Sequence, residues 1–119
     1  MARIAVAEIW TYRAMPGMDL ESVDLTDFKV EATDGGIGKV DEATYETGSG
    51  YLVVDTGPWI LGRKVMLPAG VIGRIDSDEE KVYVDLTKDE IKDSPEFDPD
   101  LHRDDNAYRD RLGSYYGRG

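Results

Sequence analysis

The sequence contains no cysteine, and this absence removes several kinds of chemistry at once. A chain without thiols forms no disulfide, holds no iron–sulfur cluster, and offers neither a zinc ribbon nor a thiol nucleophile. Histidine is nearly as scarce, because His102 is the single one. Sites that need several imidazoles are therefore excluded, and a serine–histidine relay has no strong serine. We expect no catalytic residue, no metal and no cofactor, and therefore a protein that is not an enzyme.

Long apolar runs are also missing. The N-terminal stretch MARIAVAEIW is interrupted by Glu8, which leaves it too short for the core of a signal peptide. No segment approaches the length that a membrane-spanning helix needs. The sequence therefore predicts a cytoplasmic protein with no membrane partner.

Positive charge is in short supply. Lys and Arg number 14 against 25 Asp and Glu, which gives a net charge of −11. Such a field repels phosphate backbones, so direct binding of nucleic acid is disfavoured. The excess of negative charge is greatest in residues 76–105, which contain thirteen acidic residues and four basic ones. We interpret this stretch as a solvated face, with a docking surface for a basic partner as the alternative.

The chain is long enough for one domain, and its patterns divide it into three zones. Residues 1–24 form an N-terminal leader, residues 25–97 carry nearly all the strand signals, and residues 98–119 form a polar tail containing glycine and tyrosine. Apolar and polar residues alternate from Phe28 to Thr33, as in a half-buried strand. Asp34-Gly35-Gly36 then predicts a tight hairpin. The next strand runs from residue 37 to about 45, with a bulge near Asp41 and Glu42 where the apolar phase slips.

Further strands follow at short spacing. Residues 51–54 are apolar on both faces, which predicts a central strand. Residues 64–67 and 71–76 form strands on either side of a bend at Pro68-Ala69-Gly70, and residues 81–86 alternate cleanly. Thr87 and Glu90 are spaced as a capping box for a short helix that Pro95 ends. The fold class predicted is mainly β, a small five- to six-stranded barrel with a short C-terminal helical turn.

Asp55-Thr56-Gly57 follows an apolar strand, as half a catalytic dyad does in dimeric aspartic proteases of the retroviral type. Residues 71–74 resemble the later apolar-apolar-Gly-Arg element of those enzymes. The span from the end of the first element to the start of the second, residues 57–71, has only fifteen residues, which is too few for the intervening strands and flap. We therefore interpret Asp55 as a strand-end residue whose carboxylate caps the turn at Gly57-Pro58, and keep the protease as a remote alternative.

Two other sequence features are interpreted as structural. His102 lies among aspartates, but the spacing matches no calcium loop, so we interpret this stretch as a solvated acidic linker. Gly35-Gly36-Ile37-Gly38 joins two strands and opens no helix, so it lacks the helix N-terminus that binds a nucleotide phosphate.

Aromatic residues gather outside the predicted barrel. Tryptophan and tyrosine are favoured anchors at interfaces, since they bury much area with few rotatable bonds. The candidate interaction surface therefore comprises Trp10, Tyr12, Trp59, Tyr108, Tyr115 and Tyr116. The alternative is that leader and tail fold back and cover their own barrel.

The run YLVVDTGPWILGRKVMLPAGVIGRIDSDEEKVYVDLTKDEIKDSPEFDP, residues 51–99, resembles a PRC-barrel domain. That module occurs in the H subunit of the photosynthetic reaction centre and in the C-terminal half of a ribosome-maturation factor. The resemblance rests on the strand-Asp-Thr-Gly segment, the Arg63-Lys64-x-x-x-Pro68 strand, and the Val82-Tyr83-Val84-Asp85 strand. Residues 28–40 fit the opening hairpin, so the likeness covers residues 25–97.

The resemblance implies a non-catalytic, six-stranded barrel of the short, stand-alone bacterial type, used for docking proteins or ribonucleoprotein. Our leading hypothesis is a protein-interaction or assembly module that self-associates as a homodimer. The alternative is an adaptor in ribosome maturation or RNA processing, whose acidic surface binds a basic ribosomal protein. Fold analogy alone supports that alternative.

Overall fold

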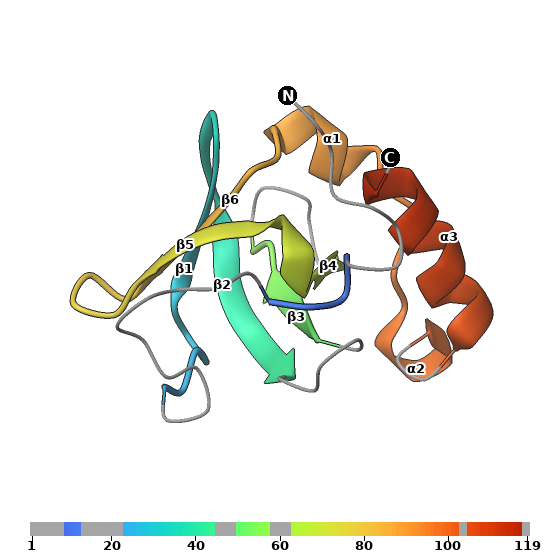
Figure 1. The fold of residues 1–119 in the computed structure, drawn as a ribbon, viewed down its shortest axis with the longest axis horizontal. Coiled ribbons are helices and arrows are strands. Elements are labelled where there is room, and N and C mark those ends of the chain that lie inside the picture. The colour runs from blue at the N-terminus through green and yellow to red at the C-terminus, as the bar shows by residue number, and fades with distance from the viewer. Residues whose placement is uncertain (1–8, 13–22, 45–49, 58–62, 103–104, 118–119) are drawn as a thin grey trace.

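A single mixed β-sheet is the centre of the fold. The computed structural model describes residues 9–12, 23–44, 50–57, 63–102 and 105–117, and within them the sheet has six strands (Figure 1). The strands are β1 (Lys29–Ala32), β2 (Gly35–Thr44), β3 (Tyr51–Asp55), β4 (Lys64–Pro68), β5 (Ile72–Asp76) and β6 (Lys81–Val84). Their hydrogen-bonded order is β4-β3-β2-β1-β6-β5. The β1–β6 pair is parallel, and the other neighbours are antiparallel. The predicted mainly-β class is confirmed, with six strands.

The sheet curls on itself because its two edge strands are neighbours in the sequence. β4 and β5 stand at opposite ends of the hydrogen-bonded order, yet only the 3₁₀ turn η3 (Ala69–Val71) joins them. Three residues span at most about 11 Å, so the two edges must lie close together. This turn is the bend predicted at Pro68-Ala69-Gly70, and it gives the sheet its barrel-like form.

Two local predictions about the strands are confirmed. The register of β2 against β3 shifts between Val40 and Glu42, which is the predicted bulge. β3 lies between β2 and β4, and its residues Tyr51, Leu52, Val53 and Val54 are all buried. Because strand side chains alternate, burial of all four means that both faces of β3 are covered.

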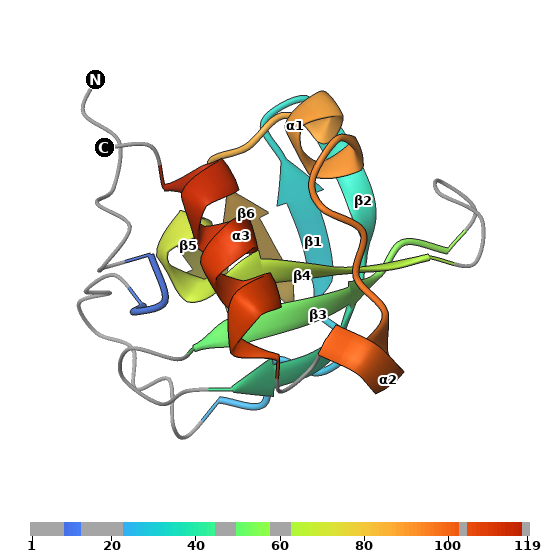
Figure 2. The same ribbon diagram turned by 90° about the vertical axis from the view of Figure 1, so that its right-hand side faces the viewer.

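Three helices follow the last strand. They are α1 (Lys88–Lys92), α2 (Pro99–His102) and α3 (Asn106–Tyr116). α1 begins with the predicted capping box, in which Thr87 Oγ1 accepts from the Glu90 N–H at 3.1 Å and Glu90 Oε1 accepts from the Thr87 N–H at 3.0 Å. α3 lies beside β3 and β4 in both views (Figures 1 and 2). It covers the outer face of β3, where the Arg109 guanidinium sits 4.9 Å from the centre of the Tyr51 ring.

Leader and tail contribute to the same core as the strands. Ile9, Tyr108, Leu112 and Tyr116 belong to one cluster of buried side chains with residues of all six strands. The Cα radius of gyration is 13.1 Å, close to the ~13 Å expected of a compact domain of about 100 residues. The predicted division at residues 24 and 97 stays a prediction.

No helix among the residues described is both long and apolar enough to cross a bilayer.

Candidate functional site

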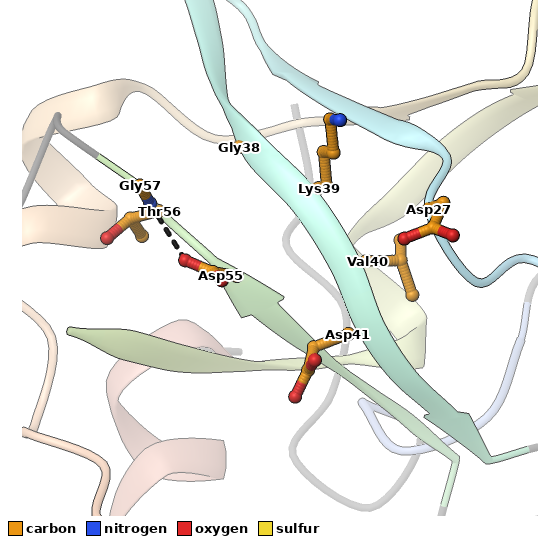
Figure 3. A pocket seen from close by; sticks show the side chains of 8 residues that line it. All are labelled: Asp27, Gly38, Lys39, Val40, Asp41, Asp55, Thr56 and Gly57. Carbon is orange, nitrogen blue, oxygen red and sulfur yellow. Dashed lines mark hydrogen bonds between the residues drawn. The ribbon is translucent and has the colours of Figure 1, made fainter. Parts of the chain in front are cut away.

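A hollow beside the end of β3 contains the Asp-Thr-Gly segment. It has a volume of about 280 Å³ and is lined by Asp27, Gly38, Lys39, Val40, Asp41, Asp55, Thr56 and Gly57 (Figure 3). β2 lines one side of it, and Asp55 at the end of β3 and the two residues that follow line the other, while Asp27 comes from the segment before β1. The backbones of its two sides approach closely at Gly38, where a Cβ would fall 2.0 Å from the Asp55 carbonyl oxygen.

The Asp55 side chain stabilises the turn after β3. One carboxylate oxygen accepts a hydrogen bond from the Gly57 N–H at 2.9 Å, as Figure 3 shows. Gly57 has a φ of 54°, a left-handed conformation that glycine adopts without strain. The predicted capping role of Asp55 is therefore confirmed. A protease dyad would need two Asp55 carboxylates to meet across a dimer axis, and that alternative stays a prediction.

Charges of both signs alternate across the strands at this hollow. Asp55 lies opposite Lys39 of β2 on one side and Lys64 of β4 on the other. Lys64 Nζ donates to Asp41 Oδ2 at 2.8 Å. The hydrogen bond to Asp41 raises the pKa of Lys64, and the nearby charge of Asp55 acts in the same direction.

The carboxylates of the hollow do not converge on one point. In Figure 3, Asp55 and Asp27 lie on opposite sides of the β2 ribbon. Within the described residues, no group of three His, Asp or Glu side chains is arranged to hold a metal ion. We interpret this hollow as the structural consequence of the bulge and the Asp55 turn.

A larger groove lies between the start of β4 and α2. Its volume is about 570 Å³, and Arg63, Lys64, Glu96, Phe97, Asp98, Pro99, Leu101 and His102 line it. Phe97 is 5% exposed and is held by an antiparallel bridge to Lys64. Leu101 is 71% exposed and is the one large hydrophobic side chain so exposed among the described residues. The groove therefore combines an apolar side chain in solvent with charged walls.

The α2 wall of the groove is held in place by His102. Its Nδ1 atom accepts a hydrogen bond from the Asp98 N–H at 2.9 Å, which closes the α2 turn on itself. The imidazole also stacks on the Tyr108 ring at 4.4 Å between centroids, with 10° between the planes. Tyr108 in turn donates from its hydroxyl to the Pro95 carbonyl at 2.9 Å. His102 was predicted to lie in a solvated linker, but it is half-buried and positions Leu101 at the surface.

The opposite wall carries a buried donor, Arg63 Nε, that meets no acceptor among the described residues. The Nε atom of Arg63 is buried, and no hydrogen-bond partner reaches it from the described part of the chain. The Arg63 carbonyl, by contrast, accepts from Thr56 Oγ1 at 2.7 Å, so the backbone of this residue is fixed. A buried donor left unsatisfied costs about 1–3 kcal/mol.

The predicted aromatic surface turns mainly inward. Tyr108 and Tyr116 are 1% and 4% exposed, and burial raises the pKa of both phenols. Trp10, Tyr12 and Tyr115 are half-buried and pack against the same core. Where the structure describes them, at residues 9–12 and 105–117, leader and tail pack against their own barrel, which favours the alternative interpretation. Trp59 lies outside the described residues.

Two features of this region were not predicted from the sequence: the helix α3 and the exposure of Leu101. Tyr108, Leu112, Tyr115 and Tyr116 follow the i, i+4, i+7, i+8 spacing of an amphipathic helix, and Asp105 precedes them as the N-cap of α3. That spacing could have predicted α3 where only a polar tail was expected. The exposure of Leu101 carries no such signal, because a single leucine beside prolines and aspartates has no periodicity.

Comparison of the chain with models of protein families gives no match. An uncharacterized protein of Deinococcus radiodurans is 39% identical over 80 residues, which cover 64% of this chain and 26% of that protein. The chain thus spans about a quarter of the relative's length. Among solved structures, one described as a 16S ribosomal RNA processing protein, RimM, of Pseudomonas aeruginosa aligns with a TM-score of 0.47 and 26% identity. The alignment covers 63% of this chain and 47% of that one.

Proposed function

We propose that this chain is a non-catalytic assembly module that self-associates through the groove between β4 and α2. The observation that carries the proposal is Leu101, which is 71% exposed at a groove of about 570 Å³. Transfer of exposed leucine surface out of water favours association, and a few residues in desolvated pockets carry most of the binding energy of an interface.

The charges of the groove fit a second copy of the same chain. Arg63 and Lys64 supply positive charge from the β4 side, and Glu96 and Asp98 supply negative charge from the α2 side. In a two-fold interface each copy presents the same patch, so the patch must complement itself. A two-fold axis through the groove would place the basic wall of one copy on the acidic wall of the other. Glu96 of the second copy would then face the guanidinium of Arg63.

A second part of the proposal concerns the family to which the barrel belongs. We propose that residues 25–97 form a PRC-barrel domain, which the six-stranded sheet and the bend at η3 support. The adaptor role in ribosome maturation and the cytoplasmic location stay predictions.

The experiment is sedimentation equilibrium of purified chains over a concentration series. Leu101→Asp should weaken self-association by roughly 30-fold, the scale of a 2 kcal/mol anchor. Because Leu101 is exposed in the single chain, the thermal midpoint should not change at concentrations at which the wild type is monomeric. A wild-type chain that stays monomeric at every concentration would refute the proposal.

Charge reversal adds a sharper test of the two-fold geometry. Arg63→Glu and Glu96→Arg should each weaken association, because each sets like charges against one another. The chain carrying both substitutions should recover association, since the pairing is then restored in reversed sense. Additive loss in the double variant would rule out an interface in which Arg63 faces Glu96.

A further inference from the structure

The α2 turn is closed by a histidine nitrogen that carries no proton. The Nδ1 atom of His102 accepts a hydrogen bond from the Asp98 N–H at 2.9 Å. An imidazole nitrogen accepts a hydrogen bond only when it is unprotonated, so the ring is neutral here, with its proton on Nε2. The bond between His102 and Asp98 therefore exists in one charge state of the side chain alone.

No orientation of the charged ring replaces this bond. In an imidazolium both nitrogens are donors, so a protonated Nδ1 would set two N–H groups against one another across 2.9 Å. Rotation of the ring by half a turn would place a C–H group at the same point, and a C–H group accepts nothing. Protonation of His102 therefore deprives the Asp98 N–H of the acceptor that the ring provides.

The same histidine joins α2 to the start of α3, which lies beside it (Figure 2). Its ring stacks on the Tyr108 ring at 4.4 Å, and its carbonyl accepts from the Asp105 N–H at 3.1 Å. Leu101 lies inside the closed turn, because its own N–H donates to the Asp98 carbonyl at 3.1 Å. The direction in which Leu101 points thus depends on the bond between Asp98 and the His102 ring.

Charged groups of both signs surround His102. Those that the structure describes on the elements around it are Arg63 and Lys64 at the start of β4, Glu96 and Asp98 before α2, Asp100 within α2, and Asp105, Tyr108 and Arg111 at or in α3. Burial raises the pKa of Tyr108, so its phenol stays neutral. Among these residue types and histidine, only imidazole ordinarily changes its charge between pH 5 and 8. The nearby carboxylates would accept from an imidazolium that has turned out of the closed turn.

We infer that His102 is a pH-sensitive switch, in which protonation of the ring opens the α2 turn and withdraws Leu101 from the groove. The turn is closed at neutral and alkaline pH, and it opens as pH falls through the range in which histidine ordinarily gains its proton. The opening of α2 is a property of the single chain. Its effect on self-association rests on the proposed function.

The test places a nitroxide spin label on the variant Leu101→Cys. The chain contains no cysteine, so the label occupies this position alone, and the 71% exposure of Leu101 leaves room for it. The substitution also removes the anchor of the groove, so the label reports on the single chain. The mobile component of its electron paramagnetic resonance spectrum should rise several-fold between about pH 7.5 and about pH 5.5. The midpoint should match that of the imidazole proton signal in NMR, which belongs to the single histidine.

The matched control adds His102→Asn, because the asparagine oxygen accepts a hydrogen bond and does not titrate. The label should then show the same mobility at both pH values. A label that does not respond to pH in the chain with His102, or that responds equally in His102→Asn, would overturn the inference.

Sedimentation equilibrium of the unlabelled wild type tests the effect on the groove. Self-association should weaken roughly tenfold at the lower pH, and that of His102→Asn should not weaken. A wild type that is monomeric at both pH values, with a label that responds, refutes the proposed function and supports the switch. Self-association with a label that does not respond has the opposite meaning.

Discussion

The hydroxyl of Tyr108 donates a hydrogen bond to the carbonyl oxygen of Pro95 at 2.9 Å, across the segment that carries α2. The same tyrosine ring stacks on His102 and lies 5.7 Å from the Phe97 ring. One buried side chain of α3 thus holds both ends of the segment that presents Leu101 to solvent.

Replacement of Tyr108 by Phe removes this hydrogen bond and retains the stacked ring. The free energy of unfolding should fall by about 1 kcal/mol, because the Pro95 carbonyl loses its partner at a partly buried position. Urea denaturation followed by circular dichroism measures the change. Tyr108→Leu removes the stacked ring as well and should cost more. Equal losses in the two variants would mean that the ring contributes nothing.

Alkaline pH should unfold the α3 side of the molecule. Burial raises the pKa of Tyr108 and of Tyr116 above the ordinary value of about 10. In the unfolded chain these phenols ionise near pH 10, while in the folded chain they stay protonated, so the stabilisation is complete below about pH 10 and is lost as pH rises through the folded-state values. Tyrosinate absorbance at 295 nm should show a late, cooperative step that coincides with loss of helical signal.

The control for this titration is the variant with Phe at both positions. Neither position can then ionise, so its stability should fall less steeply above pH 10 than that of the wild type. Identical slopes would show that these phenols are not what couples folding to pH.

Substitution of two glycines that have positive φ distinguishes the cost of backbone strain alone from the cost of strain combined with a steric clash. Gly38 has a φ of 153° and Gly57 a φ of 54°. Gly57→Ala should cost about 1–2 kcal/mol, because strain is its sole penalty. Gly38→Ala should cost at least about 3 kcal/mol, because its Cβ would also meet the Asp55 carbonyl. Thermal and urea midpoints of the two variants give the comparison, and a larger loss at Gly57 would contradict the close approach of β2 to β3.

The capping box at α1 gives a fourth test. Thr87→Ala should lower the free energy of unfolding by about 1 kcal/mol, because it frees the Glu90 N–H that the hydroxyl satisfies. Ser114→Ala, at an exposed position of α3, should change little. A double-mutant cycle of Thr87→Ala with Glu90→Ala should show coupling, since both side chains belong to one reciprocal pair.

The strands were predictable because half-burial leaves a period of two in the sequence. β1 and β6 show it directly, with every second residue buried, and the slip of that period at Asp41 located the bulge. α3 was missed because Gly113 and the charged residues 109–111 weaken a helical pattern that rests on four apolar positions. The aromatic residues were recognised as anchors, but residue type alone does not say whether an anchor docks on its own barrel or on a partner.

The parallel pairing of β1 with β6 has a consequence for the chain while it is being synthesised. β1 gains its first partner, β2, as soon as the hairpin at residues 34–36 is synthesised, but its other edge pairs only with residues 81–83. A growing chain that ends before residue 81 therefore holds a strand with an unpaired edge at what will become the middle of the sheet. Such edges invite pairing between neighbouring nascent chains. The interval between translation of β2 and release of β6 is thus the period in which this small protein is most exposed to misassembly.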